Sequence, residues 1–194
     1  MGTIDVRSCT AGGELYNPFC DIVQRMTKQD SILASEITAE GFLADSVVAA
    51  EGKLFVQGGG WNLLNSIQIP LRQARIGIGL LIRVPFALAN NMPRKFTLRL
   101  EDQDGNVLPL TDAPPGMQTD DGKLRVLEGG FTVGRPPLVQ PGDEQVLPIA
   151  MNIDGLVFEK AGAYVFKFDV DGVPVKTLPF RLIHLPQAMA FRPQ

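Results

Sequence analysis

The stretch from Gly41 to Trp61, GFLADSVVAAEGKLFVQGGGW, decides the fold. Leu43 to Val48 and Lys53 to Val56 are short apolar runs rich in β-branched residues, a composition typical of strands. Ala49 to Gly52 between them suits a four-residue hairpin turn in which Gly52 adopts a positive φ. The three glycines from Gly58 to Gly60 then allow a bulge or a change of sheet. The stretch therefore predicts a hairpin followed by a sharp bend.

Trp61 is the only tryptophan and follows this bend directly. A tryptophan at such a place anchors a core corner, where its ring is buried and its indole N–H finds a carbonyl. It also suits a ligand or partner contact, because interface anchors draw on the same residue type. Both interpretations stay open, so Trp61 is a candidate interaction residue.

Further strands follow at short intervals. Arg75 to Val84 places Ile76, Ile78, Leu80 and Ile82 on one face, and Gly77 and Gly79 on the other. That bare face lets a second layer or a partner backbone come close, although a simple edge explains it equally well. Other expected elements are strands at 63–69, 96–101, 145–153, 164–170 and 173–183, a strand at 124–133 broken by Gly129-Gly130, and an exposed loop at 111–122.

Tyr164 stands at the start of the expected strand 164–170, which the Asp171-Gly172 turn joins to the last strand. This placement is typical of the tyrosine corner in immunoglobulin-like sandwiches, where the hydroxyl bonds back to upstream backbone. We therefore predict an all-β fold, an immunoglobulin-like antiparallel β-sandwich.

The motifs LADSVVAAEGKLFVQGGGW, RVPFALANN, FTLRLEDQDG, FTVGRPP and AGAYVFKFDVDG occur in this order. In these motifs and their order, the chain resembles a family of uncharacterised, mostly actinobacterial proteins known as a domain of unknown function. The resemblance covers about residues 41–184. It implies an immunoglobulin-like sandwich and carries over no catalytic residues. The first forty residues depart from the family pattern and are interpreted on their own.

Residues 1–40 are predicted to form an N-terminal arm, and residues 41–194 the sandwich. Asn17-Pro18 is typical of a helix start, and Phe19, Ile22, Val23 and Met26 recur at helical spacing. A short amphipathic helix needs to dock, either on its own sandwich or on a partner. These four residues and Trp61 are the candidate interaction residues.

Charge and composition restrict the partners and the location. The net charge is −3, and residues 1–40 account for all of it with three basic and six acidic side chains. The sequence thus argues against nucleic acid, which needs a basic face. No membrane insertion is expected, because the longest apolar run, Ile76 to Ile82, is too short to span a bilayer. The first residues lack the pattern of a signal peptide, so we expect a cytoplasmic protein, or one packaged into a particle from the cytoplasm. Cys9 and Cys20 are then expected to be reduced thiols.

The sequence offers no constellation for catalysis, cofactor binding or metal binding. His184 is the only histidine, and an enzyme would have to bring Cys9 or Cys20 to it across the fold. Acidic residues gather at 101–104, 120–121 and 169–171, where tight turns explain them better than calcium does. The leading hypothesis is a non-catalytic structural or protein-interaction module, partnered by itself or another protein within a larger assembly. The alternatives are a ligand- or calcium-binding domain and a virion or particle-surface protein.

Overall fold

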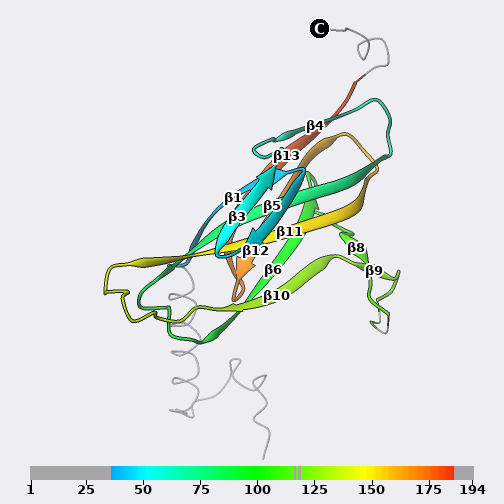
Figure 1. Cartoon of the computed structure of the whole chain (residues 1–194). Helices are drawn as coiled ribbons and strands as arrows, with labels where there is room; N and C mark the ends of the chain where they lie inside the picture. The colour runs from blue at the N-terminus through cyan, green and yellow to red at the C-terminus, as the bar shows by residue number, and fades with distance from the viewer. Residues whose placement is uncertain (1–35, 116, 118, 186–194) are drawn as a thin grey trace, which may run out of the picture.

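The structure is a computed structural model that describes residues 36–115, 117 and 119–185. Within these residues every regular element is a strand, and two curled sheets enclose one apolar core (Figure 1). The prediction of an all-β fold is confirmed. The predicted helix with Phe19, Ile22, Val23 and Met26 lies outside the described residues, as do Cys9 and Cys20.

The smaller sheet has three antiparallel strands in the order β1-β5-β11. They are β1 (Thr38–Ala44), β5 (Leu71–Pro85) and β11 (Glu144–Phe158). The central strand β5 contributes Ile76, Ile78, Leu80 and Ile82 to the core, each fully buried. The alternation predicted for this strand is therefore confirmed.

The larger sheet has six strands in the order β10-β6-β12-β13-β4, with β7 pairing on β6. The strands are β4 (Leu63–Ser66), β6 (Pro93–Asp102), β7 (Val107–Leu108), β10 (Val126–Thr132), β12 (Gly162–Val170) and β13 (Val173–His184). The pair of β13 and β4 is parallel, whereas the other pairs are antiparallel. The sheet therefore departs from the purely antiparallel arrangement that was predicted, because β4 and β13 are far apart in the chain and no hairpin joins them.

Two small hairpins complete the fold. One is formed by β2 (Ser46–Ala50) and β3 (Lys53–Gln57), the other by β8 (Thr111–Asp112) and β9 (Lys123–Leu124). The second hairpin lies where the sequence predicted an exposed loop. The described residues contain no helix of the length and apolar character that crossing a membrane requires.

One predicted break is wrong. β10 runs without interruption through Gly129 and Gly130, and pairs with β6 along its whole length. The reason lies opposite Gly129: a Cβ there would come within 2.3 Å of the Phe96 ring, which occupies that space. Gly129 therefore leaves room for the Phe96 ring on this face of the sheet. In the sequence alone, the glycine pair resembles a break in the strand.

Candidate interaction surface

The hairpin of β2 and β3 forms where the sequence predicts it, with a tighter turn. Its strands pair from Ser46↔Gln57 to Ala50↔Lys53, which leaves two turn residues instead of four. Glu51 and Gly52 both have positive φ, 52° and 69°, the combination that a two-residue turn between twisted strands needs. The positive φ predicted for Gly52 is confirmed.

The hairpin lies on the outer face of the three-stranded sheet, over the two glycines of β5 (Figure 1). A Cβ on Gly77 would stand 3.0 Å from the Ser46 backbone of β2, and one on Gly79 would stand 2.9 Å from Leu54 Cδ2 of β3. Because these two residues have no side chains, the hairpin can pack directly on this face of the sheet. Of the explanations that the sequence left open for the bare face, the close approach of another layer of the same chain is the one observed.

Asn152 of β11 fixes the hairpin in place. Its Oδ1 accepts a hydrogen bond from the Val47 N–H at 3.0 Å, and its Nδ2 donates one to the Val47 carbonyl at 2.8 Å. The Val47 side chain beneath is 1% exposed. One amide side chain thus satisfies both backbone groups of a residue whose strand has no partner on that side.

The solvent face of the hairpin carries large apolar side chains. Val48 and Phe55 are direct cross-strand partners on this face, exposed to 55% and 54%. We call these two residues the hairpin patch. Val56 is also exposed, to 43%, but it pairs with the buried Val47 and therefore lies on the opposite face of the hairpin. Clustered apolar exposure of this kind is a mark of interaction sites, whereas single exposed hydrophobes are ordinary.

Trp61 closes the bend after the hairpin. The Gly60 N–H donates to the Leu43 carbonyl at 2.8 Å, and Trp61 forms an isolated bridge with Leu43. The Trp61 ring meets Phe180 edge to face, with centroids 6.0 Å apart, and packs against the core. Its Nε1 is buried and has no hydrogen-bond partner among the described residues. The predicted core corner is observed, but the predicted carbonyl partner is not.

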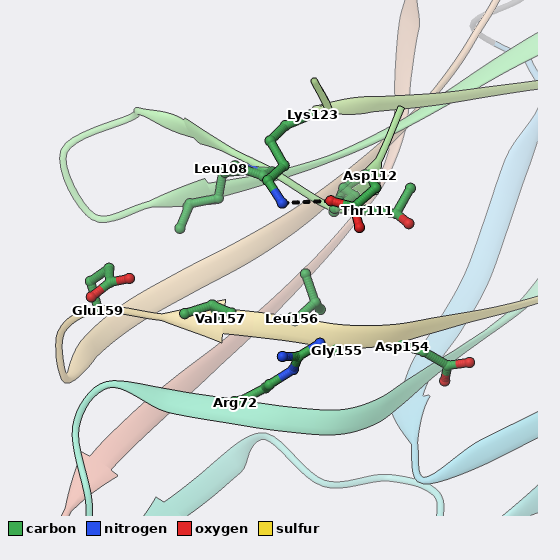
Figure 2. A pocket seen from close by; sticks show the side chains of 12 residues that line it. Arg72, Leu108, Thr111, Asp112, Lys123, Asp154, Gly155, Leu156, Val157 and Glu159 are labelled. Carbon is green, nitrogen blue, oxygen red and sulfur yellow. Dashed lines mark hydrogen bonds and ion pairs between the residues drawn. The ribbon is translucent and has the colours of Figure 1, made fainter. Parts of the chain in front are cut away.

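A pocket of about 440 Å³ lies between the end of β11 and the hairpin of β8 and β9 (Figure 2). Leu108, Leu156 and Val157 give it apolar walls, and Lys123 and Asp112 pair across its rim at 2.5 Å. The hydrogen bond from Lys123 lowers the pKa of Asp112. Asp154 is likewise paired with Arg75, at 2.6 Å. Within the described residues, Arg72 and Glu159 also line the pocket and form no ion pair, so its charges are only partly neutralised.

The acidic turn residues are engaged by the protein itself. Asp102 accepts hydrogen bonds from the backbone N–H groups of Asp104 and Asn106. Asp121 accepts from the Lys123 N–H and pairs with Arg125, which lowers the pKa of Asp121 to about 2. Within the described residues, no three His, Cys, Asp or Glu side chains converge on a metal-sized site. Asp102 and Asp121 thus bond to the turns in which they lie.

Charged side chains on the outer face of the larger sheet form one network. Arg99 pairs with Glu101 at 2.8 Å and with Asp169, and Lys167 pairs with Glu101 at 2.5 Å. The two cations are direct cross-strand partners, so Glu101 screens a repulsion that would otherwise oppose the pairing of β6 and β12. Hydrogen bonds from Lys167 and then Arg99 lower the pKa of Glu101.

The remaining polar candidates have structural contacts. His184 is exposed, and its Nε2 lies 3.3 Å from the Ile67 carbonyl oxygen. Arg135 donates to the carbonyls of Phe86 and Ala87, and its guanidinium lies over the Phe86 ring. The hairpin patch itself was missed from the sequence. Its signal was the adjacent pair Val47-Val48, in which one residue must face outward once the other is buried.

The sequence profile of a family of unknown function, DUF6941, matches residues 41–183. The chain belongs to this family. The resemblance predicted for residues 41–184 is thus confirmed as a domain of unknown function, whereas the actinobacterial distribution stays a prediction. The matched segment holds the hairpin of β2 and β3 and nearly all of both sheets. No functionally curated protein matches the chain.

Among solved structures, the family member is similar to the Pseudomonas fluorescens alkylpurine DNA glycosylase AlkC bound to DNA containing an abasic site analog. The similarity has a TM-score of 0.40 and 13% sequence identity, and covers 88% of this chain and 40% of the glycosylase chain. Likeness at this level carries no argument about activity.

This comparison corrects one prediction. The sequence excluded nucleic acid on the basis of net charge, and that exclusion is wrong, because a net charge summed over the whole chain does not describe any one surface. The solved structure to which the chain is similar is itself that of a protein bound to DNA. The low TM-score equally gives no support for DNA binding by this chain.

Proposed function

We propose that this chain is a non-catalytic protein-interaction module, an immunoglobulin-like sandwich that presents the hairpin patch to a partner protein within a larger assembly. The observation that carries the proposal is the pairing of Val48 with Phe55, both more than half exposed on one face of a docked hairpin.

The patch is held ready for binding. Asn152 bonds to both backbone groups of Val47, and the Leu54 side chain of β3 occupies the space above Gly79. A surface whose backbone is fixed in advance loses little conformational entropy on association. Phe55 has the character of an interface anchor, because aromatic side chains in desolvated contacts dominate binding energy. Full burial of such a side chain contributes about 1.5–3 kcal/mol.

The immunoglobulin-like assignment is supported by Tyr164. Its hydroxyl donates to the Lys160 carbonyl at 2.6 Å, four residues upstream, as a tyrosine corner does. The ligand- or calcium-binding alternative has weaker support, because the acidic turn residues bond to their own turns. A particle-surface role is one form of the proposed module. The cytoplasmic location stays a prediction.

Site-specific photo-cross-linking tests the proposal. A photoreactive residue is placed at position 55 of the full chain in its native host, with position 92 as the control, because Met92 is equally exposed on another part of the surface. We expect a covalent adduct with a discrete protein from position 55 and none from position 92. The purified partner should then bind the purified chain directly. Equal adduct patterns from both positions would refute the proposal.

A further inference from the structure

A second surface on the molecule has the properties of a self-pairing strand edge. β10 ends the six-stranded sheet, and among the described residues it pairs with β6 alone. None of its seven residues is buried. An edge strand is normally blunted by lysine, proline or a bulge, because its open backbone groups invite another strand. The sequence of β10, VLEGGFT, contains neither lysine nor proline.

We infer that two copies of this chain pair antiparallel through their β10 strands, with Gly129 at the two-fold axis. This inference goes beyond the proposed function, because it concerns a different sheet and a different partner. A two-fold axis at Gly129 aligns all seven residues of each strand, so the six-stranded sheets of two copies become one continuous sheet.

Apolar residues match in this register. Leu127 lies opposite Phe131 of the second copy, and the reverse pair repeats the contact across the axis. Both side chains belong to the core-facing side of β10 and are only partly buried in the single chain. Cross-strand aromatic and aliphatic pairs of this kind stabilise antiparallel sheets. The pairing would therefore cover apolar surface that the single chain leaves partly open.

Charges match as well, on the opposite face of the sheet. Glu128 lies opposite Gly130 of the second copy, and Gly130 is the register partner of Lys95. Since Gly130 has no side chain, the Glu128 carboxylate can reach over it to the second copy's Lys95, across two strand spacings of about 4.8 Å each. Glu128 and Lys95 are both exposed, and within the described residues neither forms an ion pair.

The space for this contact exists in the structure. Lys95, Glu128, Gly129 and Gly130 are among the residues that line an open hollow of about 700 Å³, and Asp171, which also lines it, is paired with Arg94. The two glycines thus have different roles. Gly129 leaves room for the Phe96 ring on the inner face of the sheet, and Gly130 leaves the outer face open.

Charge reversal in the full chain tests the pairing. Sedimentation equilibrium is measured for the natural chain, Glu128→Lys, Lys95→Glu, the double variant, and Glu159→Lys as a control with the same charge change at a distant exposed site. We expect a monomer–dimer equilibrium that each reversal at Glu128 or Lys95 weakens about tenfold, because two symmetric attractions become repulsions. The double variant should restore the natural dimer, and the control should leave it unchanged.

A cysteine pair tests the register independently. Val126 lies opposite Thr132 of the second copy, so a Val126→Cys and Thr132→Cys variant, with Cys9 and Cys20 changed to serine, should form a disulfide-linked dimer on mild oxidation. Val126→Cys alone should not. A natural chain that stays monomeric at all concentrations, or a double reversal that fails to rescue, would overturn the inference. Phe55→Ser should leave this dimer intact, which separates failure here from failure of the proposed function.

Discussion

Glu101 pairs with two cations, Arg99 and Lys167, on the larger sheet. Substitution of Glu101 therefore measures how much this charge network contributes to the free energy of unfolding. Glu101→Gln removes the charge that pairs with Lys167 and Arg99, which then face each other across β6 and β12. We expect the free energy of unfolding at pH 7 to fall by about 1–3 kcal/mol. Urea denaturation measures this change, and Glu159→Gln, at an exposed site, serves as the control.

The same network predicts a dependence on pH. The folded-state pKa of Glu101 is lowered, so its contribution is fully present above the unfolded value of about 4.3 and is lost as the pH falls through the folded pKa. The stability difference between the natural chain and Glu101→Gln should therefore shrink below pH 4. A difference that stays constant down to pH 2 would show that the charge of Glu101 does not act as described.

The contribution of the Tyr164 hydroxyl to stability can be measured separately from that of its ring. Tyr164→Phe keeps the stacked contact with Phe180 but removes the hydroxyl that bonds to the Lys160 carbonyl. Because this leaves a carbonyl without its partner, we expect a loss of about 1–2 kcal/mol in the free energy of unfolding. Chemical denaturation checks it, and an unchanged midpoint would contradict a structural role for the hydroxyl.

At the scale of elements, the hairpin of β2 and β3 is held by a few identifiable contacts. Asn152→Ala removes both hydrogen bonds to Val47 and exposes its backbone groups to water. We expect amide hydrogen exchange across residues 46–57 to accelerate about tenfold or more, while β12 and β13 keep their protection. Uniform acceleration over the whole domain would mean that the hairpin does not open as a separate unit.

The strands themselves were largely predictable because their side chains alternate. In 76–82 the four core residues alternate with Gly77, Gly79 and Leu81, and in 96–101 apolar residues alternate with polar ones, which leaves one orientation for each strand. The turn at Glu51-Gly52 was placed correctly but judged too long, because a non-glycine residue with positive φ is not visible in the sequence.

The contacts between distant strands were not predictable. The continuity of β10 depends on Phe96, more than thirty residues away, whose ring takes the place of a Gly129 side chain. The position of the hairpin depends on Asn152, about one hundred residues from Val47. The hairpin patch follows from these contacts, since Val48 and Phe55 face solvent only because the other side of the hairpin is docked. Local sequence patterns carry no information about such pairings.

At the scale of the whole molecule, the two proposed surfaces lie on different sheets. The hairpin that carries the patch covers part of the three-stranded sheet, and β10 is the edge strand of the six-stranded sheet. Occupation of one therefore leaves the other open. A dimer built through β10 would carry two hairpin patches, and a bivalent module binds a repetitive partner surface more tightly than a single copy does.

The affinity of the partner that cross-links at position 55 tests the central claim most directly. Calorimetric titration of that purified protein compares the natural chain with Phe55→Ser and with Met92→Ser, which removes an equally exposed side chain elsewhere. The account predicts that Phe55→Ser raises the Kd about tenfold or more, with unchanged thermal stability, and that Met92→Ser leaves the Kd unchanged. Equal Kd values for all three proteins would contradict the claim that the hairpin patch is the binding surface.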